Sequence, residues 1–252
     1  MNKILFLTGC NGQLGKTVTK TFAKNNWKVF GLDIHEESNN ENLFRYISGS
    51  VRERESFDEL FSTAKSFVDS NSKFCLVNNA GTAVFTPSEE RTYEEFLLVS
   101  EVNLLGPIFG CTEFYKFSKD IVDNFSNSID FKIMNIASVY GLISPNKSIY
   151  TDTARTSSEI YGATKAGLIQ MTKYFAARYA ESGISVNCIA PGGILNRSLQ
   201  GPEFIQNYSK LVPLGRLCNE DEVSSLLFSL VSGNFQYVTG QTIAIDGGMT
   251  SW

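Results

Sequence analysis

Short apolar runs alternate along the chain with longer amphipathic segments. The apolar runs show little alternation with polar residues, which is typical of parallel strands covered on both faces. Seven such runs are predicted as strands, at 3–8, 27–32, 44–47, 73–78, 130–137, 184–190 and 241–245. The amphipathic segments are predicted as helices, at 14–25, 52–70, 91–118, 158–182 and 219–232.

This order of elements predicts an α/β fold with one doubly wound, mostly parallel seven-stranded sheet and helices on both faces. No linker, repeat or low-complexity tract interrupts the pattern, so residues 1–252 are interpreted as a single domain. The polar run 36–42 is short for a full crossover helix. We expect an irregular connection there.

Composition narrows the classes of partner. The chain has 252 residues, 42% of them hydrophobic, and a net charge of −4, so no basic surface indicates nucleic-acid binding. The apolar runs are shorter than a membrane span, and we expect no membrane association. The chain opens on a predicted strand without a signal-peptide layout.

The cysteines and the single histidine limit the possible chemistry. Five cysteines form no CxxC pair and no metal-ligand spacing, which favours reduced thiols in a cytoplasmic protein and no metal site. His35 is the only histidine, so Ser-His-Asp and Cys-His catalysis are excluded unless it takes part. It follows Asp33 in a polar stretch and is predicted to lie on a surface loop.

Tyr161 and Lys165 lie four residues apart in the predicted helix 158–182, so both side chains face the same way. A free phenol titrates near ~10, and a neighbouring ammonium group favours the phenolate and lowers that pKa. Such a pair can exchange a proton near neutral pH. The alternative is an ordinary solvated helix face.

Three glycines, Gly9, Gly12 and Gly15, follow the first strand and open the first helix. Glycine permits a tight turn and lets backbone N–H groups approach a pyrophosphate at the helix N-terminus. The position after a strand and before a helix predicts dinucleotide binding. The alternative is a structural turn.

Asp33 ends the second strand, where an acidic residue of a dinucleotide fold binds the adenosine ribose hydroxyls. The same carboxylate repels a 2′-phosphate, and the loop from Gly9 to Gly15 has no Lys or Arg to attract one. NAD(H) is therefore favoured over NADP(H). The alternative is an aspartate that only starts a turn.

Other strands also end in small or polar residues, as Asn78-Asn79-Ala80-Gly81, Ser138 and Pro191-Gly192-Gly193. In open α/β sheets, ligands bind in the crevice at the carboxyl ends of the strands. We expect these residues and Tyr161 to meet in one such crevice.

Together these motifs resemble the short-chain dehydrogenase/reductase family, in its compact single-domain, Rossmann-type branch. The matching residues follow the family order along nearly the whole chain: Gly9, Gly12 and Gly15, Asp33, Asn78 to Gly81, Asn103, Ser138, Tyr161 with Lys165, Pro191-Gly192 and Asp246-Gly247-Gly248.

The resemblance implies four catalytic residues. Tyr161 would exchange a proton with the substrate oxygen while hydride moves to or from the nicotinamide. Lys165 would lower the pKa of Tyr161 and hold the nicotinamide ribose. Ser138 would hydrogen-bond the substrate oxygen, and Asn103 would bind a water in a proton relay behind Lys165.

The resemblance also implies the cofactor contacts. The glycine loop would hold the pyrophosphate, Asp33 the adenosine ribose, residues 79–81 the middle of the cofactor and residues 191–194 the nicotinamide. Besides Tyr161 and Lys165, the implied cofactor-binding residues are Gly9, Asn11, Gly12, Gln13, Leu14, Gly15, Asp33, Ile34, Ser50, Val51, Asn79, Ala80, Gly81, Pro191, Gly192 and Ile194.

The chain departs from the family pattern in three places. The glycines are spaced G-x-x-G-x-x-G, a pattern commoner in the larger relatives that act on nucleotide sugars. Ser50-Val51 stands where the family often has Asp-Val, which leaves the adenine contact open. Finally, 23 positions separate Ser138 from Tyr161, about ten more than the family norm.

Both ends of this insertion are catalytic, so we expect it to project over the mouth of the site. It is rich in hydroxyl groups and includes Lys147, Asp152, Arg155 and Glu159. Such a surface suits a polar substrate, such as a sugar or a sugar phosphate whose anion meets Arg155 or Lys147. The alternative is a solvated loop.

The insertion and the segment 194–197 also resemble a bacterial subgroup linked to surface-sugar and legionaminic-type biosynthesis, including flagellin-modification oxidoreductases. Within the family, the segment 200–214 would be a mobile substrate lid. Within the family, two surfaces would form homotetramer or homodimer interfaces: the apolar surface of the helix around Leu168, Met171 and Tyr174, and the C-terminal residues 249–252. The alternative is that these helices are buried only on their own sheet.

The sequence therefore predicts an NAD-dependent oxidoreductase that interconverts a secondary alcohol and a ketone on a polar, sugar-like small molecule. One alternative, motivated by the glycine spacing, is a sugar epimerase or dehydratase that retains its NAD. Another is a dinucleotide-sensing protein without turnover, which has no evident need for all four catalytic residues.

Overall fold

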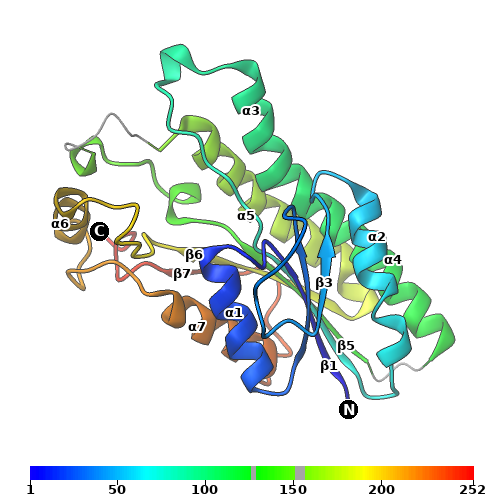
Figure 1. Cartoon of the computed structure of the whole chain (residues 1–252). Helices are drawn as coiled ribbons and strands as arrows, with labels where there is room; N and C mark the ends of the chain where they lie inside the picture. The colour runs from blue at the N-terminus through cyan, green and yellow to red at the C-terminus, as the bar shows by residue number, and fades with distance from the viewer. Residues whose placement is uncertain (126–128, 151–156) are drawn as a thin grey trace.

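The computed structural model describes residues 1–125, 129–150 and 157–252. Seven parallel strands form one sheet in the order β3-β2-β1-β4-β5-β6-β7, which confirms the predicted doubly wound fold (Figure 1). The strands are β1 (Lys3–Thr8), β2 (Lys28–Asp33), β3 (Arg45–Ser48), β4 (Lys73–Asn78), β5 (Asp130–Ile136), β6 (Ile184–Pro191) and β7 (Thr242–Ile245).

The helices lie between the strands. They are α1 (Gln13–Lys24), α2 (Arg54–Ser62), α3 (Tyr93–Ser100), α4 (Gly106–Asn124), α5 (Glu159–Tyr179), α6 (Pro202–Lys210) and α7 (Glu220–Ser232). A π-helical segment, Glu101–Leu105, joins α3 to α4. Short 3₁₀ turns occur at Lys65–Phe67, Ser88–Glu90, Val139–Gly141, Lys147–Ile149 and Ala180–Ser182.

Two helix predictions were wrong. The helix expected over 52–70 ends at Ser62, where the hydroxyls of Ser62 and Thr63 donate to backbone carbonyls three residues earlier. Such local hydrogen bonds compete with continuation of a helix. The prediction also missed α6, which begins with Pro202 at its first position after Gly201. The connection at 34–44, all of it described, contains no helix, as expected.

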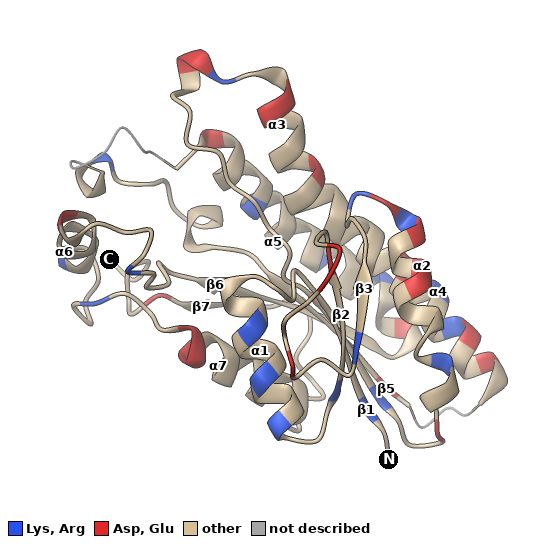
Figure 2. Cartoon of the chain, in the orientation of Figure 1, with Lys and Arg blue, Asp and Glu red and all other residues tan. Residues whose placement is uncertain are grey.

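The sheet separates two hydrophobic cores. Along β1, Ile4 and Phe6 face one side, where α2, α4 and α5 pack, and Leu5 and Leu7 face the other, where α1 and α7 pack (Figure 1). The charged residues of α1, which are coloured blue in Figure 2, are exposed: Lys16, Lys20 and Lys24. Because both faces are covered, the interior positions of β1, β2 and β4 are almost all apolar and buried, as the sequence indicates.

The stretch Tyr93–Asn124 is a continuous helical run long and apolar enough to cross a membrane by length and composition alone. In the fold, its α4 portion packs against α2 and the sheet, and buries Phe114 and Phe117 in the core. The buried apolar residues of α4 therefore belong to the core of the fold.

All strands run in the same direction, so their carboxyl ends lie at one edge of the sheet. Thr8, Asp33, Asn78, Ser138 and Pro191 all lie at or just beyond strand ends on this edge. The topology thus gathers polar residues that are far apart in the sequence, as predicted.

Replacement of Phe6 tests the larger core. Its side chain is fully buried and its ring lies within 4.8–6.2 Å, between centroids, of Phe30, Phe61, Phe74, Phe114 and Phe117. We expect Phe6→Ala to lower the free energy of unfolding by about 3–5 kcal/mol, measured by denaturant titration. The control Tyr237→Ala, at a fully exposed residue, should change it by less than ~0.5 kcal/mol. Equal effects would contradict the assignment of this cluster as the core.

Candidate active site

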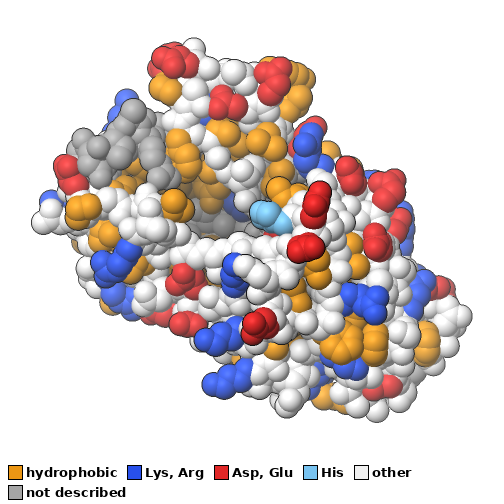
Figure 3. Space-filling view, in the orientation of Figure 1, with side chains coloured by type: hydrophobic (Ala, Val, Ile, Leu, Met, Phe, Trp, Pro, Cys, Tyr) orange, Lys and Arg blue, Asp and Glu red, His pale blue; other side chains and the backbone are white. Residues whose placement is uncertain are grey.

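A cavity of about 500 Å³ opens at the carboxyl edge of the sheet. Figure 3 shows the molecular surface hollowed there, with hydrophobic side chains around the opening. Ten of the predicted site residues line it: Gln13, Leu14, Asn79, Gly81, Ser138, Tyr161, Lys165, Pro191, Gly192 and Ile194. The structure thus brings three of the four predicted catalytic residues into one cavity.

Ser138 and Tyr161 meet from different elements. Ser138 follows β5, and its hydroxyl accepts a hydrogen bond from the Tyr140 N–H at 3.2 Å. Tyr161 lies in the first turn of α5, which Ser158 caps through the Tyr161 N–H. Burial raises the pKa of Tyr161, and its hydrogen bond with the Ser138 hydroxyl partly opposes that rise. The net direction is opposite to the expected lowering, because burial has the largest effect.

Lys165 is a buried ammonium group. Its side chain lies one turn after Tyr161, with Nζ 5.7 Å from the centroid of the Tyr161 ring. Nζ donates to the carbonyl of Ile136, at the end of β5, at 2.8 Å. Burial lowers the pKa of Lys165 from its ordinary 10.5 to about 8, because the charged form loses hydration. Lys165 is therefore charged at neutral pH, but it loses its proton at a lower pH than an ordinary lysine.

Asn103 lies behind the cavity lining, in the π-helical segment between α3 and α4. Its side chain is completely buried, so Asn103 is not a helix-surface amide. Its Oδ1 accepts from the Thr82 N–H at 2.8 Å, and its Nδ2 donates to the Thr82 carbonyl at 2.9 Å. A β-carbon on Gly81 would lie 3.4 Å from Asn103 Oδ1 and 3.6 Å from Lys165 Nζ, so the two polar groups face the same small space.

The N-terminus of α1 fits an anionic group. Gly12 occupies the N-cap and, among the described residues, no side chain caps the helix. By contrast, α3 and α7 have capping boxes, formed by Thr92 with Glu95 and by Asn219 with Glu222. Unpaired N–H groups and the helix dipole at such an end attract phosphate. The donor set at this end of the cavity therefore suits a dinucleotide diphosphate.

Asn79 and Thr8 fix the shape of the glycine loop. Nδ2 of Asn79 donates to the carbonyls of Thr8 and Gly9, and the Thr8 hydroxyl accepts from the N–H groups of Asn79 and Ala80. A β-carbon on Gly9 would lie 2.8 Å from Ala80 Cα, and Gly9 has a positive φ of 67°. The loop can close on β4 only because this residue is glycine.

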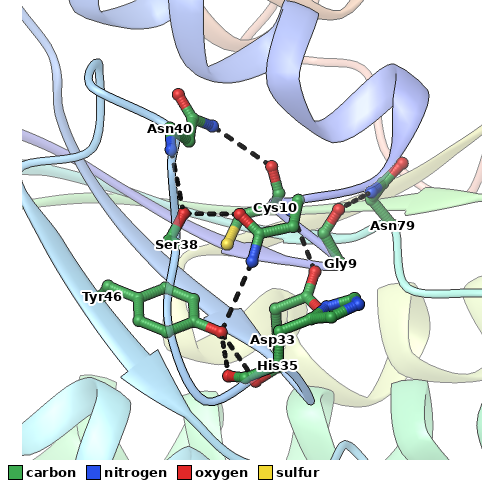
Figure 4. Close-up of polar contacts among 9 residues, drawn as sticks. Gly9, Cys10, Asp33, His35, Ser38, Asn40, Tyr46 and Asn79 are labelled. Carbon is green, nitrogen blue, oxygen red and sulfur yellow. Dashed lines mark hydrogen bonds and ion pairs between the residues drawn. The ribbon is translucent and has the colours of Figure 1, made fainter.

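The Asp33 carboxylate joins β2 to the glycine loop (Figure 4). One oxygen accepts from the Asn11 N–H at 2.9 Å, and the other lies 2.7 Å from Nδ1 of His35. His35 is exposed, as predicted for a surface loop, but its pairing with Asp33 was not foreseen. The Tyr46 hydroxyl donates to the carbonyl of His35 and, at 3.3 Å, to that of Asp33.

Three further predicted cofactor-binding residues, Ile34, Ser50 and Val51, lie in different surroundings. Ile34 is exposed beside Asp33. The Ser50 hydroxyl accepts from the Arg52 N–H at 3.2 Å and so supports the turn before α2. Val51 is buried in the core against Gly106. The Val51 side chain therefore packs in the core and does not line the cavity.

Of the four charged residues predicted around the mouth, the structure describes Lys147 and Glu159, and neither of these two lines the cavity. Asp152 and Arg155 lie outside the described residues. Lys147 is exposed and does not line the cavity, and Glu159 pairs with Arg91 at 2.9 Å. Among the lining residues that the structure describes, Lys165 is the charged one.

Aromatic side chains that the sequence analysis missed line the substrate end. They are Phe85, Tyr140, Tyr150, Phe204 and Tyr208, the last two from α6. The hydroxyls of Tyr140 and Tyr150 lie 3.1 Å apart. The Gly193 N–H donates to the Tyr208 hydroxyl, and a β-carbon on Gly193 would lie 2.7 Å from the Tyr208 ring. The Gly192-Gly193 pair was the sequence signal for this close approach.

The side chain of Gln13 bridges the glycine loop and the segment that leads into α6. Its Nε2 donates to the Leu195 carbonyl at 2.8 Å and to a carboxylate oxygen of Glu220. Its Oε1 accepts from Nδ2 of Asn196 at 2.9 Å. The two sides of the crevice are therefore tied together at the level of the α1 N-terminus.

Comparisons with known proteins agree with this geometry. The family described as enoyl-(acyl carrier protein) reductase matches residues 11–250. The chain is 31% identical to 3β-hydroxysteroid dehydrogenase 1 of Eggerthella lenta, over 98% of this chain and 94% of that protein. It is 28% identical to post-translational flagellin modification protein A of Campylobacter coli, over 98% of each chain.

Two solved structures share the fold. A short-chain dehydrogenase from Leptospira borgpetersenii with bound NAD+ has a TM-score of 0.85 and 34% identity, over 99% of this chain and 93% of that one. ElxO with NADP bound has a TM-score of 0.82 and 26% identity, over the full length of both chains. Proteins similar to this one thus bind NAD+ or NADP.

The burial of Lys165 makes the free energy of unfolding depend on pH. Its folded-state pKa lies below its unfolded value, so the folded protein binds fewer protons between pH 8 and 10.5, and stability rises with pH in that window. Below pH 8, Lys165 is charged in the folded protein, and the full cost of burying that charge lowers stability. We expect Lys165→Met to raise the free energy of unfolding at neutral pH by about 1–2 kcal/mol, after allowing for the lost hydrogen bond.

That advantage should shrink as the pH rises from about 8 to about 10.5, when the wild-type lysine loses its charge. Denaturant titrations of both proteins across this range provide the measurement. If Lys165→Met is less stable than wild type at every pH, the assignment of Lys165 as a costly buried charge is contradicted.

Gly193→Ala tests the contact between the β6 turn and α6. The added methyl group overlaps the Tyr208 ring, so we expect a loss of about 1–3 kcal/mol in the free energy of unfolding. In a Tyr208→Leu background, the same change should cost less than ~1 kcal/mol, because the ring is gone. Identical costs in the two backgrounds would show that the ring does not set the requirement for glycine.

Proposed function

This chain belongs to the short-chain dehydrogenase/reductase family of oxidoreductases, and we propose that it interconverts a secondary alcohol and a ketone with NAD(H) as its coenzyme. The observation that carries this proposal is the convergence of Ser138, Tyr161 and Lys165 on the cavity that also contains the uncapped N-terminus of α1. A proton-transfer group and a dinucleotide-diphosphate site thus share one crevice.

A bound nicotinamide supplies or accepts the hydride. The Tyr161 hydroxyl donates a proton to the substrate oxygen in reduction and accepts one in oxidation. The Ser138 hydroxyl, already hydrogen-bonded to Tyr161, donates to the same oxygen and stabilises the charge that develops there. Lys165, positioned by the Ile136 carbonyl, holds a positive charge one turn away.

The Asn103 and Thr82 pair supports a proton path behind Lys165. Asn103 Oδ1 and Lys165 Nζ face the same space beside Gly81, and a water there would have polar partners on two sides. We assign Asn103 to holding that water. The π-helical turn places its amide, in keeping with the frequent use of such turns at functional sites.

Asp33 supports the preference for NAD(H). Its carboxylate lies at the end of β2 and is held by the Asn11 N–H, and residues 9–15 carry no Lys or Arg. Ribose hydroxyls can donate to the free lone pairs of the carboxylate, whereas a 2′-phosphate meets its negative charge.

For the substrate, we propose an uncharged, sugar-like ring. The aromatic side chains Tyr150, Phe204 and Tyr208 offer flat apolar faces, and the hydroxyls of Tyr140 and Tyr150 offer polar groups at their edge. The lack of a second charged residue among the described lining positions favours a neutral molecule over the sugar phosphate considered from the sequence. The similarity to a flagellin modification protein supports a carbohydrate-related role.

Assembly and location are also proposals. Leu168 and Met171 on α5 are buried in the chain's own core, so they are not available to the expected interface. Tyr174 on α5 and Trp252 at the C-terminus are exposed, and this exposure supports contact through these two residues in a homotetramer or homodimer. Four of the five cysteines are buried thiols, in keeping with a cytoplasmic enzyme. No nucleic-acid or membrane partner is proposed.

Tyr161→Phe tests the proposed chemistry. Removal of the hydroxyl eliminates the proton donor without a change in ring shape, so turnover should fall by about 10²–10⁴-fold while NADH still binds. NADH binding is followed by fluorescence, and turnover by NADH formation with a panel of neutral cyclic alcohols and sugars. Survival of activity in the variant would refute the assignment of Tyr161.

The same assay separates the alternatives. Net NADH release with an alcohol supports the dehydrogenase. Product formation without NADH release would instead indicate an epimerase or dehydratase that retains its cofactor. Tight NADH binding with no turnover of any substrate in the panel would favour a sensing role.

A further inference from the structure

The only histidine of the chain contacts the carboxylate that we assign to coenzyme selection. We propose that His35 makes the choice between NAD(H) and NADP(H) depend on pH: with His35 protonated, the site tolerates a 2′-phosphate that it rejects when His35 is neutral. This inference rests on the proposed coenzyme role of Asp33 and adds a specificity residue to it.

The pair is held in place by its surroundings. Asp33 is almost fully buried, with a side-chain exposure of 8%, and the Asn11 N–H fixes its second oxygen. The main chain of His35 is fixed by the Tyr46 hydroxyl, which donates to its carbonyl. The imidazole itself is 67% exposed, so it can exchange protons with solvent while Nδ1 stays 2.7 Å from Asp33 (Figures 3 and 4).

The loop that carries His35 is also tied to the glycine loop. The Ser38 hydroxyl donates to Oδ1 of Asn11, and Nδ2 of Asn40 donates to the Cys10 carbonyl at 3.2 Å. Nδ2 of Asn11 reaches the Tyr46 hydroxyl at 3.4 Å. Residues 38–40, the glycine loop and β3 thus form one hydrogen-bonded unit around the carboxylate, and the imidazole keeps its place beside it (Figure 4).

Two titratable groups from the elements around the pair, Cys10 and Tyr46, stay neutral in the relevant pH range. From the glycine loop, burial raises the pKa of Cys10 to about 12, and from β3, burial also raises the pKa of Tyr46 to about 12, so both stay neutral. On the loop itself, Glu36 and Glu37 are exposed carboxylates. Imidazole is the side chain that ordinarily changes charge between pH 5 and 8.

The electrostatic sign follows from these charges. With a neutral imidazole, the Asp33–His35 pair carries one negative charge and repels a phosphate group. With a protonated imidazole, the pair is neutral overall, and the repulsion is removed. Ribose hydroxyls carry no charge, so NAD(H) affinity should respond much less. By reciprocity, NADP(H) binding should favour uptake of a proton by His35.

The test is equilibrium binding of NADH and NADPH, followed by fluorescence, to the full-length wild-type protein and to His35→Asn. The asparagine amide can replace the Nδ1 donor but cannot acquire a charge, and the exposed site should accept the change without loss of the fold. In wild type, the ratio of the Kd for NADPH to that for NADH should fall about tenfold from about pH 8.5 to about pH 5.5.

In His35→Asn, the ratio should fall only about threefold, because the 2′-phosphate itself gains a proton near pH ~6. Titration calorimetry in two buffers of different ionisation enthalpy should show more proton uptake on NADPH binding by wild type than by His35→Asn. Asp33→Asn should lower the ratio at the higher pH, because the repelling charge is absent.

Equal pH dependence and equal proton uptake in wild type and His35→Asn would overturn the role of His35 while leaving the proposed function intact. Failure of either nucleotide to bind wild type at any pH would overturn the proposed function itself, and this inference with it.

Discussion

The common direction of the seven strands is the constraint on which this site depends. A parallel sheet covered on both faces leaves no room for polar chemistry on its faces, so polar residues are confined to the strand ends. Here one edge receives the glycine loop after β1, Asp33 after β2, Asn79 after β4, Ser138 after β5 and the Gly192-Gly193 turn after β6. The cavity is a direct product of that shared direction.

The site uses the fold's own backbone as its support. Lys165 is positioned by a carbonyl at the end of β5, Asn103 by the main chain of Thr82, and the side-chain amide of Asn79 by the carbonyls of Thr8 and Gly9. Burial of the Lys165 ammonium group destabilises the folded state, and the apolar side chains buried in the two cores offset this effect. Rigid main-chain groups thus hold side chains whose charges the interior would otherwise disfavour.

The strands and the edge residues were predictable because each depends on a local signal. Buried parallel strands are continuous apolar runs, and the Gly9 to Gly15 loop has its own spacing. Three features were missed: the aromatic side chains of α6 in the cavity, the hydrogen bonds of Gln13, and the contact of His35 with Asp33. The first two join residues that become neighbours only in the assembled tertiary fold. The third depends on a side-chain direction that the sequence does not specify. Helix α2 ends before residue 70 because serine and threonine hydroxyls bond to its last carbonyls, and the hydrophobic periodicity of the sequence does not reveal such bonds. The rise in the pKa of Tyr161 was not foreseen, because it comes from burial, which the spacing of Tyr161 and Lys165 does not reveal.

The separation of the core into two clusters by the sheet also bears on how such a chain can diverge. Neighbouring residues of β1 belong to different clusters, so a substitution at Phe6 is compensated among α2, α4 and α5, and one at Leu7 among α1 and α7. Each half can drift in sequence without a matched change in the other. A fold of this kind can therefore persist among relatives that differ at most positions, while inheritance of chemistry rests on the few residues at one edge.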